Sequence, residues 1–160
     1  MKTNKLAIEE QCLTIEQTKE LIKLGIDFSG SNFIFVHMLL GNWGNGINER
    51  QRQYYLSPNF GDYVKIFTKN IPTLSISEML EMLPNEIACM EDGYLTSYSL
   101  MYDGYSLGYV EWCGGEKAHH KINISEGEDF TDGYEICLRK WNLRDALFEM
   151  LKWLKQNKLI

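Results

Sequence analysis

The 160-residue sequence has few prolines, no long apolar run and no linker. Only three prolines occur, and no Pro/Ser-rich or low-complexity stretch marks a boundary between domains. The longest apolar stretch, 33–40, contains His37 and is too short to cross a bilayer. These absences predict a single domain over residues 1–160 with no membrane-spanning segment.

Cysteine pairs at short spacing are also missing. The four cysteines, Cys12, Cys89, Cys113 and Cys137, form no C-x-x-C motif, so a zinc site is not expected. Residues 1–12 are half polar and lack the apolar run of a signal peptide. We therefore predict reduced thiols, a cytoplasmic location, and no metal or other cofactor.

Positive charge is scarce, since the net charge is −6. Residues 75–135 hold thirteen Asp or Glu against two Lys, whereas 139–158 carry six Lys or Arg against two acids. Nucleic-acid affinity depends on Lys and Arg that displace counterions, so a nucleic-acid partner is not expected. A weaker hypothesis places such contact on the basic segment, at Arg139, Lys140, Arg144, Lys152 and Lys155.

No catalytic motif occurs in the sequence context that its chemistry requires. The glycine-rich stretch 41–46 is followed by Ile47 and Asn48 rather than the Lys and Ser/Thr of a phosphate-binding loop. The acidic segment 126–132 lacks the order of a calcium loop, and H-E-x-x-H does not occur. G-x-S-x-G occurs once, at 104–108, but within the predicted hairpin rather than at the strand-to-helix turn that a nucleophilic serine of this motif needs. The sequence favours a non-enzyme without deciding the question.

What the sequence does contain is three well-marked helices. Thr14 with Gln17, and Ser75 with Glu78, have the spacing of capping boxes, which predicts helices at 14–24 and 76–83. A third helix is predicted from Asn142, a good N-cap, to about residue 156. Its apolar residues recur at helical spacing along one face: Leu143, Ala146, Leu147, Met150, Leu151 and Leu154.

Strands are predicted between these helices. The run 33–40 is apolar on both faces, as in a strand covered on both sides, and 63–68 and 134–138 are shorter strands. The rest of 41–70 has no clear pattern. Asp103-Gly104 and Gly114-Gly115 are two-residue hairpin signals, which predict a three-strand meander at 94–124.

Taken together, these elements predict an α+β fold. Hairpin connections favour an antiparallel sheet of about four to five strands, with helices packed on one face. Two-residue turns fix a register, and its predicted pairs are Tyr102 with Tyr105, Tyr98 with Tyr109, Thr96 with Glu111, Cys113 with Glu116, Glu111 with Ala118, and Tyr109 with His120.

This register gathers a candidate ligand site on the core face of the sheet. Tyr98, Tyr109, Glu111 and His120 would share that face, where a Glu–His contact could act as a general base with its orienting partner. His119 would point to the opposite, polar face. The alternative is a buried histidine packed among core residues, with the tyrosines stabilising the sheet as cross-strand pairs.

Two aromatic residues of the last helix form a second candidate surface. Phe148 and Trp153 lie to either side of the apolar stripe, roughly 100–120° from its centre at 3.6 residues per turn. Either the core contact of this helix is wide, or the two rings meet a partner. In the second case a homodimer through the helix is the simplest expectation.

Three segments of the sequence also carry a resemblance. They are 13–17 with 24–27, then 72–75 running to 80–84, and finally 145–151. Together they resemble a group of small uncharacterised proteins encoded in gut-bacterial genomes, often in prophage-like or mobile regions. The resemblance implies a cytoplasmic bacterial or phage accessory protein, and it brings no activity to any residue.

The leading functional hypothesis from the sequence is a non-enzymatic accessory protein that binds another protein or itself. It depends on a surplus of aromatic residues without catalytic ones. The alternative is a small-molecule-binding domain, or a modest enzyme, with a pocket on the tyrosine-rich sheet face.

Overall fold

The computed structural model describes residues 10–39, 52–59, 70–113, 117–126 and 134–160. Within these ranges, three helices and two sheets confirm the predicted α+β class. The chain divides into two compact units, residues 1–78 and 79–160, with helix α2 (Ile76–Met82) at their border. Two such units can belong to one folding domain, so the single domain over 1–160 stays a prediction.

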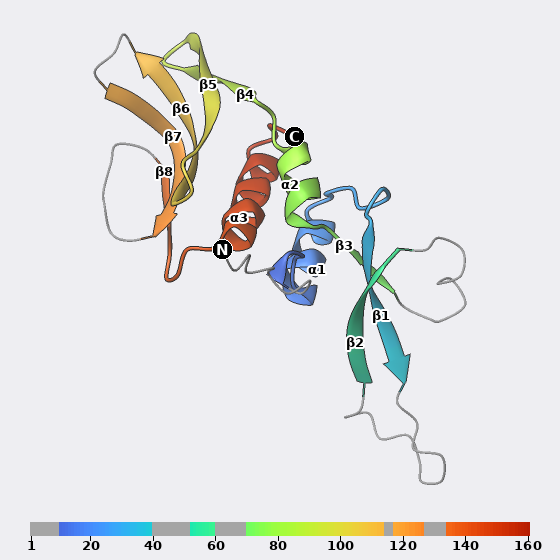
Figure 1. Ribbon diagram of the computed structural model, residues 1–160. Helices are drawn as coiled ribbons and strands as arrows, with labels where there is room; N and C mark the ends of the chain where they lie inside the picture. The colour runs from blue at the N-terminus through green and yellow to red at the C-terminus, as the bar shows by residue number, and fades with distance from the viewer. Residues whose placement is uncertain (1–9, 40–51, 60–69, 114–116, 127–133) are drawn as a thin grey trace, which may run out of the picture. The chain divides into compact units, whose positions relative to one another are not determined.

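The first unit combines one helix with a three-stranded sheet (Figure 1). The elements are α1 (Ile15–Lys23), β1 (Phe33–Leu39), β2 (Arg52–Pro58) and β3 (Ile71–Thr73), and both β2 and β3 pair antiparallel with the central β1. The strand predicted at 33–40 is therefore confirmed as β1, while β2 and β3 were not predicted. The loop at 41–46 and the strand predicted at 63–68 lie outside the described residues.

Both predicted capping boxes are present. The backbone N–H of Gln17 donates to Thr14 Oγ1 at 3.2 Å, and Thr14 N–H donates to Gln17 Oε1 at 3.0 Å. Likewise Glu78 N–H donates to Ser75 Oγ at 3.3 Å, and Ser75 N–H donates to Glu78 Oε2 at 2.8 Å. Each box satisfies two backbone donors that a helix start leaves free, which is why these two helices begin where the sequence predicts.

A buried pair of threonines joins α1 to β3. Thr18 and Thr73 are both fully buried, and their hydroxyl oxygens lie 2.9 Å apart. Thr73 donates its only hydroxyl hydrogen to the Leu13 carbonyl at 3.2 Å, so Thr18 is the donor to Thr73. The hydrogen bonds offset the cost of burying these hydroxyls, and they hold the helix against the edge of the sheet.

The second unit is a five-stranded sheet with one long helix (Figure 1). Its strands are β4 (Glu86–Glu91), β5 (Tyr94–Tyr102), β6 (Ser106–Cys113), β7 (Lys117–Glu126) and β8 (Tyr134–Leu138), in that order across the sheet. Helix α3 (Leu143–Gln156) contacts β6 and β7, and Asn142 caps it through a 2.8 Å bond from Asp145 N–H. Fully buried apolar side chains form the core between them: Leu107, Tyr109, Ile122, Ile124, Leu147, Met150, Leu151 and Leu154.

The predicted register of the meander is wrong by two residues between β5 and β6. Tyr109 pairs with Leu100 rather than Tyr98, and Tyr102 pairs with Leu107. The cause is the turn at Asp103, whose carboxylate accepts the backbone N–H groups two and three residues later, at 2.9 and 2.7 Å. Asp103 thus stabilises a four-residue loop in place of the predicted two-residue turn.

Between β6 and β7 the predicted register is wrong in a second way. Ile122 pairs with Tyr109, yet His120 pairs with Val110, so Lys121 is an extra residue in β7. Such a β-bulge changes the phase of side-chain alternation along the strand. On the turn side of the bulge the register already differs by one residue from the prediction, since Cys113 pairs with Lys117 rather than Glu116 and Glu111 pairs with His119 rather than Ala118.

Two further features of this sheet were not predicted. Strand β4 pairs antiparallel with β5 through a two-residue turn at Asp92 and Gly93, where both φ angles are positive, at 47° and 85°. The strand predicted at 134–138 is confirmed as β8, but it joins β7 in parallel, although the sheet was predicted as antiparallel. Within the described part of the chain, no helix is long and apolar enough to span a membrane.

A candidate ligand cavity in the second unit

A cavity of about 550 Å³ opens on the helix-facing side of the five-stranded sheet, between the strands and the last turn of α3. Strands β4, β5 and β6 contribute Glu91, Tyr98 and Glu111, and β7 contributes the segment 119–121. Trp153 lines the cavity from α3. The volume lies within the range typical of small-molecule sites, roughly 300–1,000 Å³.

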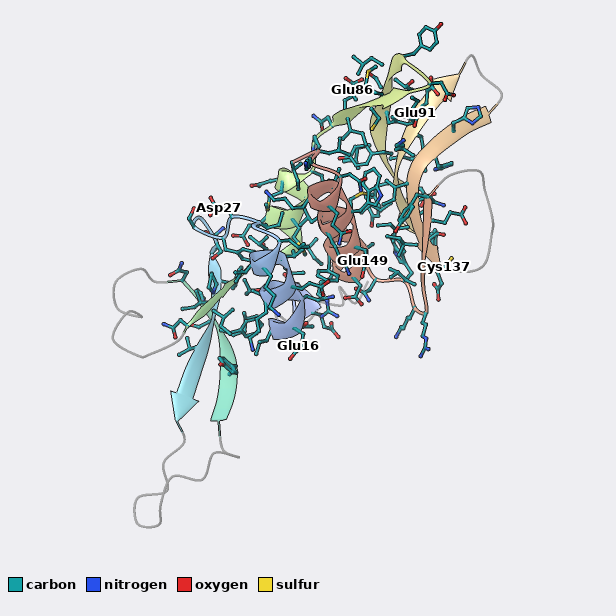
Figure 2. The ribbon with its side chains drawn as sticks, turned by 180° about the vertical axis from the view of Figure 1, so that it is seen from behind. Glu16, Asp27, Glu86, Glu91, Cys137 and Glu149 are labelled. Atoms are coloured by element: carbon teal, nitrogen blue, oxygen red, sulfur yellow. The ribbon has the colours of Figure 1, made fainter. Side chains whose placement is uncertain are left out.

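Three of these residues form a hydrogen-bonded cluster. The Tyr98 hydroxyl donates to Glu91 Oε2 at 2.5 Å, and the Lys121 ammonium forms an ion pair with Glu91 Oε1. The Lys121 Nζ atom also lies 5.7 Å from the centroid of the Tyr98 ring. Glu91 comes from the end of β4, where Figure 2 labels it, so three different strands meet in this cluster.

The bulge in β7 explains how Lys121 enters this cluster. In a regular strand Lys121 would point away from the face of its neighbour Ile122. As the extra residue of the bulge it has no partner in β6, and its ammonium instead lies against Glu91 and Tyr98 on the core face.

The cluster has clear electrostatic consequences for its members. The hydrogen bond from Lys121 and then that from Tyr98 lower the pKa of the Glu91 carboxyl, since both stabilise its charged form. Burial, followed by the hydrogen bond to Glu91, raises the pKa of the Tyr98 hydroxyl. Glu91 is therefore an ionised acceptor and Tyr98 a neutral donor over the physiological pH range.

Glu111 differs from Glu91 in having no such partners. It is half-buried and forms no hydrogen bond or ion pair with any residue that the structure describes. Its charge is close enough to Tyr98 to contribute to the raised pKa of that hydroxyl, after burial and the effects of Glu91. The carboxylate of Glu111 is thus available for a ligand.

An aromatic pair forms the opposite end of the cavity. The rings of Tyr134, at the start of β8, and Trp153 have centroids 6.4 Å apart and planes tilted by 39°. Trp153 is buried, whereas 57% of Tyr134 is exposed. Asn157 follows α3 and is fixed by its side-chain bond to the Trp153 carbonyl, at 2.9 Å.

The structure brings three of the four predicted ligand residues to this cavity. Tyr98, Glu111 and His120 line it. Tyr109 does not line it, because its ring is fully buried and its hydroxyl donates to the Pro84 carbonyl at 2.6 Å. The predicted Glu–His contact is absent among the described residues, since neither His119 nor His120 forms a hydrogen bond with Glu111.

Phe148 and Trp153, the second predicted surface, are both buried, with 6% of each exposed. Of the two predicted alternatives, the structure supports the wide core contact, because both rings of α3 are buried rather than exposed for a partner. Trp153 still takes part in the candidate site, because one side of its ring lines the cavity.

The sequence prediction missed Glu91, Lys121 and Tyr134 as site residues. Glu91 could have been found, because Asp92-Gly93 is a hairpin signal that places Glu91 directly opposite Tyr94. Lys121 could not, since its role depends on a bulge that no residue type in β7 announces.

The cavity offers carboxylates, imidazoles, an ammonium group and aromatic faces, which suffice to bind and orient a polar small molecule. In the described part of the chain, no three His, Cys, Asp or Glu side chains are grouped so that they could hold a metal ion. No family model matches the chain, and searches of curated proteins and of solved structures found no match either.

Proposed function

We propose that the second unit, residues 79–160, is a small-molecule-binding module whose ligand occupies the cavity beside Tyr98, Glu111 and Trp153. The observation that carries the proposal is the cavity itself, of about 550 Å³, with polar groups and aromatic rings on its walls. Such a combination lets aromatic faces supply contact area while a few polar groups fix orientation.

The hydrogen-bonded cluster supports the proposal further. Glu91, Tyr98 and Lys121 satisfy one another, so one wall of the cavity is preorganised before any ligand binds. A preorganised wall reduces the ordering cost that binding would otherwise pay. Glu111 then remains as the group through which a ligand gains a new interaction.

An NMR fragment screen on the full-length chain tests this proposal. A set that includes cationic, neutral and anionic aromatic fragments is added at millimolar concentration, and backbone amide shifts are followed. We expect shifts to concentrate at 119–121, at Tyr134 and at the Trp153 indole. Shifts scattered over the sheet, or none at these positions with any fragment, would overturn the proposal.

A matched pair of variants separates binding from folding in this screen. Tyr134→Ser removes an exposed wall of the cavity, and Tyr102→Ser removes a similarly exposed tyrosine that does not line it, with 57% and 49% of the residues exposed. Tyr134→Ser should weaken fragment binding by roughly threefold to tenfold, the usual range for loss of an aromatic contact. Tyr102→Ser should leave it unchanged.

Self-association is a second proposed function, favoured by an exposed apolar tip on the β4–β5 hairpin. Met90 and Leu95 form a cross-strand pair that is 68% and 69% exposed, and 78% of the adjacent Tyr94 is exposed. Strand β4 lies at the edge of its sheet, and edge strands present backbone groups to a second copy. An antiparallel β4–β4 pair would give a two-fold dimer.

Light scattering coupled to size-exclusion chromatography tests the second proposal. We expect a dimer at micromolar protein that becomes a monomer when Met90 and Leu95 are both replaced by serine. Tyr105→Ser, at another exposed hairpin end, is the control and should stay dimeric. A monomeric parent chain would rule the dimer out.

A further inference from the structure

The charges that line the cavity do not balance. Two carboxylates, Glu91 and Glu111, face one ammonium group, that of Lys121, which leaves one negative charge when histidine is counted as neutral. The ion pair with Glu91 already occupies Lys121. The unbalanced charge therefore belongs to Glu111, whose partial burial weakens its hydration and increases its gain from an opposite charge.

The aromatic end of the cavity favours the same sign of ligand. Cations are attracted to the faces of aromatic rings, most strongly to tryptophan, and here Trp153 and Tyr134 stand side by side with centroids 6.4 Å apart. At the other end of the cavity, the Lys121 ammonium lies 5.7 Å from the centroid of the Tyr98 ring, so one aromatic ring of the cavity already contacts a cation. The second unit as a whole, residues 79–160, carries fourteen acids against eight Lys or Arg, so its net negative charge also attracts cations at longer range.

An anionic ligand would meet the opposite conditions. It would have to compete with Glu91 for the Lys121 ammonium, and it would lie near the Glu111 carboxylate, which has no partner among the described residues. Like charges at such distances oppose binding. On the basis of the proposed small-molecule function, we infer that the ligand is an organic cation: an amine or quaternary ammonium group seated at Glu111, joined to an apolar part that contacts Trp153 and Tyr134.

Three probes of nearly equal shape and different charge test this inference: 2-phenylethylammonium, 2-phenylethanol and 3-phenylpropanoate. Their dissociation constants are measured by NMR titration of the full-length chain at low salt. We expect the ammonium probe to bind about fivefold more tightly than the alcohol, near the upper end for a partly exposed charge pair, and the carboxylate to bind most weakly.

Variants that change one charge each sharpen the test. Glu111→Gln should abolish the preference for the ammonium probe over the alcohol. Glu86→Gln is the matched control: Glu86, labelled in Figure 2, is exposed on β4 and does not line the cavity. This variant changes the net charge equally and should keep the preference. Lys121→Met leaves Glu91 without its counter-ion, so it should tighten binding of the ammonium probe by roughly twofold to fivefold.

The tighter binding of the ammonium probe expected for Lys121→Met is informative, because a variant that damages the fold would weaken binding instead. If the alcohol or the carboxylate binds best at the cavity amides, the inference of a cationic ligand is overturned while the binding module stands. If the ammonium probe causes no shift there although other fragments do, the same conclusion holds. If no probe or fragment shifts these amides, both proposals fall.

Discussion

The second unit contains the dipeptide Asp-Gly twice, and it forms two different turns. At Asp92-Gly93 both residues have positive φ, and the flanking residues Glu91 and Tyr94 pair directly, as expected for a two-residue hairpin. At 103–106 only Gly104 has a positive φ, at 93°, and the strands resume pairing beyond a four-residue loop.

A tyrosine follows the dipeptide in both turns, and the sequences first differ at the next residue, Leu95 or Ser106. The difference between the turns originates there and in what the aspartate side chain binds. Asp103 accepts backbone N–H groups from Tyr105 and Ser106 and the Ser106 hydroxyl hydrogen, the last at 3.0 Å. A serine three residues after the aspartate thus adds a bond that the wider loop can satisfy. The comparison teaches that a turn dipeptide marks where a chain reverses, while neighbouring polar side chains decide the register.

The largest effect is expected at Gly108, which follows the wider turn. A Cβ atom there would lie 2.6 Å from the Ile122 carbonyl oxygen, a backbone atom of the paired strand. Gly108→Ala should lower the free energy of unfolding by about 2 kcal/mol, because the strands must separate to admit the methyl group. Urea denaturation followed by circular dichroism measures the change, and a neutral result would contradict the close approach of β6 and β7.

The two turn glycines should show a smaller effect with a different cause. Gly93 and Gly104 have positive φ angles and open space around their Cα atoms. Alanine at either position should lower the free energy of unfolding by roughly 1–2 kcal/mol through backbone strain alone. Gly30→Ala is the control, since Gly30 has open space and no positive φ, and it should change stability by less than about 0.5 kcal/mol. Unequal costs at Gly93 and Gly104 would show that the turns strain the chain differently.

The smallest effect is expected at Asp103, and it should depend on pH. The hydrogen bond from Tyr105 N–H, the largest favourable cause, holds the pKa of the Asp103 carboxyl below its ordinary value of 3.8. A lowered pKa means stabilisation that is present above the ordinary value and is lost as pH falls through the folded one. Asp103→Ala should therefore cost about 1 kcal/mol near neutral pH, as for loss of a capping side chain, and less below about pH 4.

Denaturation curves of the parent and the variant across this pH range provide the measurement. Asp103→Asn is the matched control, because it keeps an acceptor oxygen and does not titrate. A constant difference between the parent and Asp103→Ala down to about pH 2 would mean that the carboxylate does not stabilise the loop.

Features that depend on a few adjacent residues could be predicted from the sequence. The capping boxes at Thr14 and Ser75 and the N-cap Asn142 place three helix starts correctly, because each side chain satisfies a backbone donor within the same turn. Strands β1 and β8 and the α+β class follow from apolar runs of the right length. These are local interactions whose partners lie three or four residues apart.

The candidate site was predicted only in part, because its residues are placed by strand register and by a bulge that no local sequence pattern predicts. The pairing of His119 with Glu111 depends on Cys113 pairing with Lys117, and the position of Lys121 depends on the bulge in β7. A register error of two residues preserved the faces of β5 and β6, so Tyr98 and Glu111 were correctly placed together. Next to the β6–β7 turn the register error is a single residue, and that odd number places His119 rather than Ala118 opposite Glu111.

The bulge also affects how mutation can change the charge of the cavity. Removing Lys121 alone would leave Ile122 opposite Tyr109 and His120 opposite Val110, now as consecutive pairs of a regular ladder. Deletion of a single codon would therefore remove the ammonium group from the cavity and would keep every residue pair between β6 and β7. In such a strand the charge of a binding site can be inherited or lost independently of the fold that surrounds it.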